Sequence, residues 1–335
     1  MRVVKSVPVE DFEFRGSIKD SDVTRMIRAF AEDPHVHENE AEALLRLNRT
    51  CPIQAPSWSG FLVEVIADYI LNQSGPEGYI TSEKSRWLIG KLATDGWIAN
   101  RAEFDLLVSI LGKARWFPLS LATFALDQVA GAVIHGFGPL RNGQGYGQLG
   151  AVPGSIGDGE IALLRTILNA FGGDSALPLT RAEMEILIGV NKAIAGRQVP
   201  AAWTDLFAKA IANMILSEHG YSVPPRSVAL RTRVAAEPPA ALDEQVALSL
   251  GTLRFDYHRQ SVEERALARL ERQRIEIVTG ESIVTEDAGW FSDLVFSRLS
   301  RAPIEAAVMD HLSRECLIGE DWEIQRVVAR GGWAA

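Results

Sequence analysis

The fold class is indicated by residues 58–69, which read WSGFLVEVIADY. Counted from Trp58, apolar side chains fall 3, 4, 7, 8 and 11 positions later, at Phe61, Leu62, Val65, Ile66 and Tyr69. This spacing places them on one stripe of an amphipathic helix. Similar helical spacing runs through most of the chain, and alternation with a period of two is confined to a short segment at 274–278. The sequence therefore predicts an all-α fold.

An internal repeat is indicated by the recurrence of this stripe. The same offsets start at Trp203 and continue through Leu206, Phe207, Ala210, Ile211 and Met214. Upstream of the two stripes, equal spacing relates Glu40, Glu42, Leu44, Leu47 and Asn48 to Glu183, Glu185, Leu187, Val190 and Asn191. A copy between them has Glu103, Asp105, Leu107, Ile110 and Leu111, followed by Leu121, Phe124 and Val129. Three copies of a helical unit are expected.

A fourth, altered copy is suspected near the C-terminus, where Thr285-Glu286-Asp287 precedes Trp290 much as Thr81-Ser82-Glu83 precedes Trp87. The copies predict an ancient duplication with two helical halves, each holding two copies. The predicted segments are an N-terminal extension at 1–17, a first half at 18–135, a Gly-rich linker or long loop at 136–156, a second half at 157–315 and a tail at 316–335. A Pro-rich interruption at about 222–260 divides the second half.

Composition excludes several classes of protein. The 335 residues contain 34 Lys+Arg and 43 Asp+Glu, and the formal charge of −9 argues against a nucleic-acid partner. Two distant cysteines, Cys51 and Cys316, cannot form a disulfide framework. The N-terminus lacks the apolar core of a signal peptide, and no apolar stretch is long enough to span a membrane. A soluble cytoplasmic protein is expected.

One inter-helix turn carries a family resemblance. Residues 92–98 read LATDGWI, and Glu103 follows at the start of the next helix. This segment, within residues 87–111, resembles the tellurite-resistance TerB family of helical domains. The resemblance implies a role in stress-response or phage-defence complexes. It also implies that a divalent metal could bind at acidic positions, here Asp95 and Glu103.

The same turn has a purely structural interpretation. Gly96 could cap the preceding helix in a left-handed conformation, assisted by Asp95, while Ile98 enters the core. Glu103 would then lie in the first turn of its helix, where it favours the helix dipole.

A second candidate metal site lies at residues 32–40, which read EDPHVHENE. Two histidines and four carboxylates within nine residues suit zinc or another transition metal. The candidate ligands are His35, His37 and Glu40, and the metals considered are calcium, zinc and manganese. An exposed acidic loop before a helix explains the segment equally well.

Other motifs indicate no catalytic residues. Residues 145–150, GYGQLG, match a dinucleotide-binding pattern, but no strand precedes them and no helix follows. Trp116 and Phe117 precede a predicted helix, either as a hydrophobic staple or as an exposed anchor for a partner. Trp322, in the tail, is a further interface candidate.

Three functional hypotheses follow. The leading one is a non-enzymatic helical repeat protein that acts as a protein-interaction module, within a bacterial stress-response complex if the family resemblance holds. The second is a metal-binding sensor or buffer that uses the acidic turns. The third is an enzyme with its site in the groove between the two halves. The partner is not identified by the sequence, and the oligomeric state stays open, a homo-oligomer included.

Overall fold

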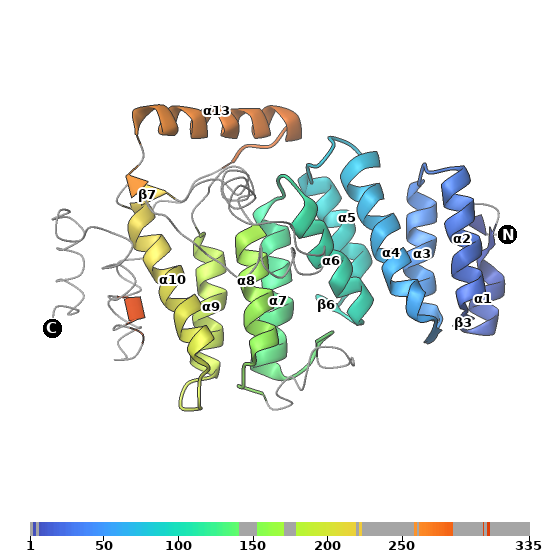
Figure 1. Cartoon of the computed structure of the whole chain (residues 1–335), viewed down its shortest axis with the longest axis horizontal. Coiled ribbons are helices and arrows are strands. Elements are labelled where there is room, and N and C mark those ends of the chain that lie inside the picture. Colours follow the sequence, from blue (N-terminus) through green and yellow to red (C-terminus); the bar gives the residue numbers. More distant parts are fainter. Residues whose placement is uncertain are drawn as a thin grey trace, which may run out of the picture. The chain divides into compact units, whose positions relative to one another are not determined.

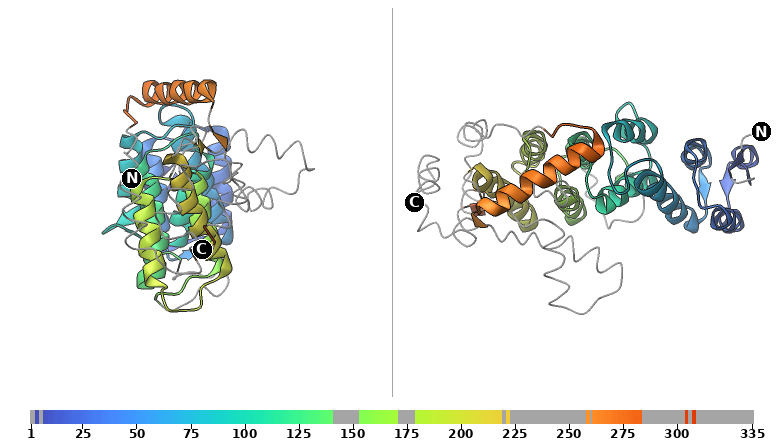
Figure 2. Two further views of the ribbon diagram at one scale, coloured as in Figure 1. Left: turned by 90° about the vertical axis from the view of Figure 1, so that its left-hand side faces the viewer. Right: turned by 90° about the horizontal axis from the view of Figure 1, so that it is seen from above.

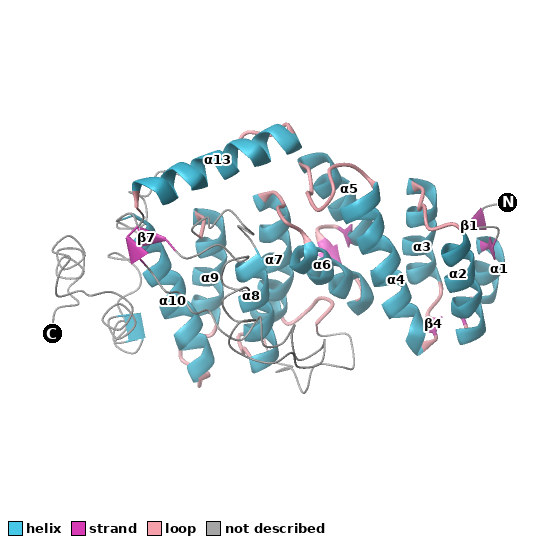
Figure 3. Ribbon diagram, turned by 45° about the horizontal axis from the view of Figure 1, so that its top comes forward, coloured by secondary structure: helices cyan, strands magenta, loops and turns pink. Residues whose placement is uncertain are grey.

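A computed structural model of the 335-residue chain describes residues 3–4, 7–140, 153–170, 179–218, 221–222, 258–259, 261–283, 304 and 307–308. Within these residues it contains eleven α-helices, one π-helix and short strands of two residues each (Figures 1 and 3). The predicted all-α class is confirmed. The chain divides into two compact units. Unit 1 comprises 1–128 and 138–143, and unit 2 comprises 129–137 and 144–335.

Unit 1 is built around one central helix. Its helices are α1 (Val9–Arg15), α2 (Asp20–Glu32), α3 (Glu38–Thr50), α4 (Pro56–Asp68), the π-helix η1 (Tyr69–Gln73), α5 (Ser82–Leu92), α6 (Arg101–Lys113) and the first part of α7 (Leu119–His135). Helix α4 packs against α2, α3 and α6. The stripe that predicted this helix supplies the contact, because Trp58, Leu62 and Ile66 are fully buried.

The end of the stripe differs from expectation. Helix α4 ends at Asp68, and the backbone continues from Tyr69 as a π-helix, so Tyr69 is only partly buried. A buried ammonium group explains why this irregular turn is tolerated. Lys84 donates from Nζ to the carbonyl oxygens of Ile70, inside η1, and of Tyr79, at 3.0 and 3.1 Å. These bonds satisfy carbonyl groups near the helix end that lack regular helical partners.

Unit 1 also contains three pairs of short strands, of which the first precedes α1 and the other two lie between helices. The pairs are β1 (Val3–Val4) with β2 (Val7–Pro8), β3 (Ser17–Ile18) with β4 (Ile53–Gln54), and β5 (Ala93–Thr94) with β6 (Trp97–Ile98). The first and third pairs are antiparallel and the second is parallel.

Unit 2 contains a second group of packed helices, α8 (Asp158–Ala170), α9 (Arg181–Ala193) and α10 (Ala201–Glu218), with α10 in contact with α8. Strands β7 (Tyr221–Ser222) and β8 (His258–Arg259) form an antiparallel pair. Helix α13 (Val262–Thr279) runs crosswise to α9 and α10 (Figure 2). Only Ile275 of α13 is buried, and the segment 274–278 that alternates in sequence is helical.

Several predicted segments lie outside the described residues. These are most of the Gly-rich linker (141–152), most of the Pro-rich interruption, Trp290 of the suspected fourth copy, and the tail at 316–335 with Trp322. Among the helices that are described, none is both long and apolar enough to cross a membrane.

Candidate functional site

Four of the packed helices begin with the same carboxylate cap. In each, the third helical residue is acidic and accepts a hydrogen bond from the backbone N–H of the residue before the helix. The pairs are Lys19 with Asp22 at 3.0 Å, His37 with Glu40 at 3.0 Å, Gly157 with Glu160 at 2.8 Å and Thr180 with Glu183 at 2.8 Å. All four acids are buried. The recurring acid in the sequence therefore marks helix starts, where it satisfies an N–H group without an intrahelical partner.

A contact between an asparagine and a tryptophan occurs twice. Asn48 is the eleventh residue of α3 and Trp58 the third of α4, and Asn191 and Trp203 hold the same positions in α9 and α10. In both places the indole Nε1 donates to the asparagine Oδ1, at 3.0 and 3.1 Å. Both tryptophans are fully buried. The asparagine thus satisfies the one polar group of a large core side chain. We call each pair, together with the cation that follows the asparagine (Arg49 in α3 and Lys192 in α9), a helix-end clamp.

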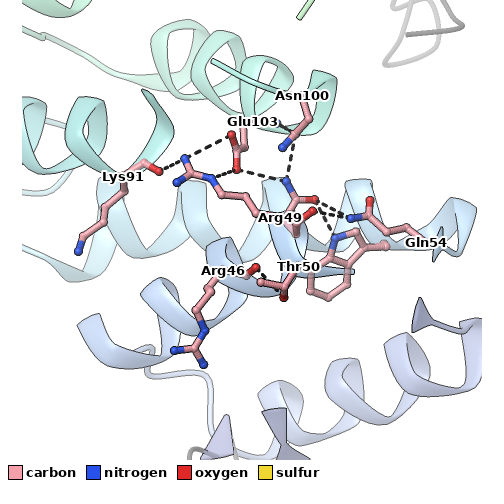
Figure 4. A network of polar contacts seen from close by, with 9 residues as sticks. Arg46, Arg49, Thr50, Gln54, Lys91, Asn100 and Glu103 are labelled. Atoms are coloured by element: carbon pink, nitrogen blue, oxygen red, sulfur yellow. Dashed lines mark hydrogen bonds and ion pairs between the residues drawn. The ribbon is translucent and has the colours of Figure 1, made fainter. Parts of the chain in front are cut away.

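The clamp at Asn48 also holds the start of another helix, where Figure 4 shows Arg49 beside Asn100 and Glu103. Asn48 Nδ2 donates to Asn100 Oδ1 at 3.0 Å and lies 3.4 Å from Glu103 Oε1. Arg49 Nε donates to the same Glu103 oxygen at 2.8 Å, and its guanidinium also donates to the carbonyl of Lys91. The end of α3 therefore binds the N-cap and the third residue of α6.

Charge explains why this contact is stable. The Glu103 side chain is fully buried, whereas that of Arg49 is 34% exposed. A buried carboxylate is tolerated only when it is paired and hydrogen-bonded, and Arg49 with Asn48 supplies both conditions. Glu103, predicted as a metal ligand, therefore has a cationic partner within the chain.

Asp95, the other acid of that turn, lies elsewhere. It is exposed at the tip of the β5–β6 hairpin, with a φ of 51°, and Gly96 follows with a φ of 84°. Helix α5 ends before it, with Ala93 as an extended C-cap, so the predicted helix-capping role of Gly96 is wrong. Two residues with positive φ form the two-residue turn that Asp-Gly favours in hairpins.

The hairpin is fixed by a buried glutamine that the sequence did not single out. Gln128 of α7 accepts from the Ile98 N–H at 2.9 Å and donates to the Gly96 carbonyl at 3.1 Å. Ile98 is buried, as expected. The turn is thus a folded connection between α5 and α6.

The loop that carries the candidate ligands His35 and His37 has exposed side chains at both positions, and Gln73 of η1 holds its backbone. His35 and His37 contact each other edge to face, with ring centroids 4.8 Å apart. Gln73 of η1 accepts from the Val36 N–H at 2.6 Å and donates to the Pro34 carbonyl at 3.1 Å. Glu40 caps α3, as described above. Across the described residues, no group of three or more His, Cys, Asp or Glu side chains is placed to hold a metal ion, so the five predicted ligands are not brought together.

The aromatic interface candidates have different environments. Trp116 is 7% exposed and Phe117 is 2% exposed, which leaves little of either side chain for a partner. The Trp116 carbonyl accepts from the Ile80 N–H at 3.0 Å, and this bond fixes the chain before α5. Trp322 lies outside the described residues.

Sequence reasoning missed Lys84. It is the third residue of α5, where other helices carry the capping acid, and it is 8% exposed. Burial lowers the pKa of its ammonium group, because removal from water disfavours the charged form. The signal in the sequence was a Lys three residues after the N-cap Thr81, in place of an acid.

Comparison with known proteins adds no relative: no family model, no curated protein and no solved structure matches this chain.

Proposed function

We propose that this chain is a non-enzymatic helical repeat protein whose units bind the starts of other helices, and that it acts as a protein-interaction module. The observation that carries the proposal is the helix-end clamp, which occurs at identical helix positions in α3–α4 and α9–α10. In unit 1 this clamp holds the N-terminus of a further helix.

We infer an internal duplication of a three-helix unit, which agrees with this function. The units would be α2–α3–α4 and α8–α9–α10, with α5–α6–α7 as a diverged copy between them. Helices α2, α3, α8 and α9 all have 13 residues and a buried acid at the third. Buried pairs at equal helix positions are Val23 and Ile161, Met26 and Leu164, Leu44 and Leu187, and Trp58 and Trp203. In the middle unit, Leu111 and Leu121 replace the asparagine and tryptophan, and both are fully buried.

The chemistry of the clamp suits recognition of helices. A helix start exposes backbone N–H groups, and an acid in its first turn is favoured there by the helix dipole. An asparagine beside a cation can bind the N-cap side chain and that acid together, as Asn48 and Arg49 do. Repeated helical units present such surfaces to partners over an extended face.

The size of the native assembly tests this function. The chain alone has a mass of 36.7 kDa. Size-exclusion chromatography of lysate from the source cell, with the endogenous chain detected by antibody, should place it in a larger assembly than the purified chain forms. Addition of recombinant chain should compete for that assembly. Equal elution of the endogenous and the purified chain at matched concentration would contradict an interaction role.

A place in a stress-response complex is the narrower part of the proposal. It rests on the resemblance of residues 87–111 to TerB domains, and the α5–hairpin–α6 arrangement is compatible with a compact helical unit of that kind. A deletion strain should grow less well on tellurite than its complemented parent. Unchanged growth would contradict the stress-response role, and the proposed role as an interaction module would still stand. The metal-sensor and enzyme hypotheses stay predictions, since no described side-chain cluster favours either.

A further inference from the structure

We propose that the helix-end clamp of unit 2, formed by Asn191, Lys192 and Trp203, is a docking site for the acidic N-terminus of a helix from a partner protein. The inference rests on the proposed function and names the class of partner for one site. It follows from a difference in exposure between two clamps that are otherwise built alike.

The two clamps share their internal geometry. Asn191 accepts from the Trp203 indole at 3.1 Å, as Asn48 does from Trp58 at 3.0 Å. The residue after the asparagine is a cation in both, Arg49 in unit 1 and Lys192 in unit 2. The backbone N–H of each tryptophan donates to the carbonyl three residues earlier, at 3.0 Å in both cases.

Their surroundings differ. In unit 1, Asn48 is 5% exposed, because the start of α6 covers it. In unit 2, Asn191 is partly exposed and Lys192 is exposed. Of the bonds that described residues form with each other, none joins Lys192 Nζ to an acid or Asn191 Nδ2 to an acceptor. The polar groups that bind a helix start in unit 1 are therefore presented to the solvent in unit 2.

Charge complementarity identifies the occupant. The unit 1 clamp binds a polar N-cap, Asn100, and an acid at the third helical residue, Glu103. Lys192 offers one positive charge at the corresponding position, which matches an acidic first turn and repels a basic one. The ammonium of lysine lacks the two-pronged geometry of arginine, so the contact should be weaker and exchangeable. A partner helix with Asn, Ser or Thr at its N-cap and Glu three residues later has the required chemistry.

The experiment uses the full chain and a surrogate of this helix start. The probe is a lactam-stapled helical peptide with the sequence of residues 99–113, ANRAEFDLLVSILGK, labelled with a fluorophore. Stapling is needed because isolated helices of this length are marginal in water. Fluorescence anisotropy should show saturable binding, and NMR should show a shift of the Trp203 indole N–H. The Trp58 indole should not shift, because α6 already covers its clamp.

Charge exchange makes the test specific. Lys192→Glu should weaken peptide binding at least tenfold, and a peptide with Glu103→Lys should regain affinity for that variant but not for the original chain. Arg86→Glu, an equal change of charge at an exposed site of unit 1, is the matched control and should leave binding unchanged. Lys192 is exposed, so circular dichroism and melting of both variants should match the original chain.

Each other outcome overturns the inference. Absence of peptide binding to the full chain, or binding that Lys192→Glu does not weaken, excludes this site. Sedimentation that shows a dimer lost in Lys192→Glu would assign the site to a second copy of the chain. If the native assembly described above persists when Lys192→Glu replaces the endogenous chain, the interaction module stands and its contact lies elsewhere.

Discussion

The α3–α4 pair and the α9–α10 pair have an asparagine and a tryptophan at the same helix positions, yet Asn48 is buried and Asn191 is partly exposed. Asn48 and Arg49 hold the start of α6 against a buried Glu103. Asn191 accepts from the Trp203 indole and is partly exposed, and the neighbouring Lys192 is exposed. The asparagine–tryptophan bond therefore forms within each pair of helices. The contacts of the asparagine amide nitrogen and of the neighbouring cation depend instead on whether the start of another helix lies against them.

The largest expected effect tests what the two regions share. Trp58→Ala and Trp203→Ala should each lower the free energy of unfolding by about 3–5 kcal/mol, because each removes a fully buried aromatic side chain and leaves a cavity. Urea unfolding followed by circular dichroism measures both. A change below about 1 kcal/mol in either variant would break the equivalence of the two pairs.

The next effect separates the two regions by charge. Arg49→Glu should cost about 3–5 kcal/mol, because it removes the cationic partner of the buried Glu103 and places a like charge against it. Lys192→Glu should change the free energy of unfolding by less than about 0.5 kcal/mol, because that side chain is exposed. The same urea titration serves both variants. Equal losses would show that Lys192 has a buried acidic partner and that the second clamp is closed.

A smaller difference is expected for the asparagines. Asn48→Ala removes bonds to Trp58, Asn100 and Glu103 and should cost about 2–3 kcal/mol. Asn191→Ala removes the bond to Trp203 and should cost about 1 kcal/mol. Thermal melts of the two variants give the ranking. If Asn191→Ala lowered the melting temperature more than Asn48→Ala does, that result would contradict the larger number of hydrogen bonds assigned to Asn48.

The smallest effect concerns Lys84, which distinguishes α5 from the helices that carry a capping acid. Its pKa is lowered by burial from the ordinary value of 10.5, so the unfolded chain binds this proton more tightly than the folded chain does. Between the two pKa values, stability therefore rises with pH. Urea unfolding at pH 7 to 10 should show the original chain gaining stability relative to Lys84→Met as pH increases. A difference that is constant or falls with pH would contradict the burial of a charged amine.

Helical periodicity was enough to predict the all-α class, because a helix that buries one face carries an apolar residue every three to four positions. It also predicted the buried stripe that begins at Trp58. It could not predict the hairpin at Asp95 and Gly96, because an Asp-Gly pair can either end a helix or turn a hairpin. The metal candidates failed to assemble for a similar reason: a dense cluster of acids in sequence also arises from helix starts, as at Glu40.

Local sequence accounts for the helices, their acidic caps and the pairing of Asn48 with Trp58 and of Asn191 with Trp203, since these depend on contacts between residues close in the chain. Other contacts are visible only in the folded chain: Arg49 neutralises Glu103, Gln128 fixes a distant hairpin, and Lys84 lies buried beneath a π-helix. Those contacts join residues that are distant in sequence or depend on an irregular turn. Their energies depend on burial and geometry, which no local pattern encodes.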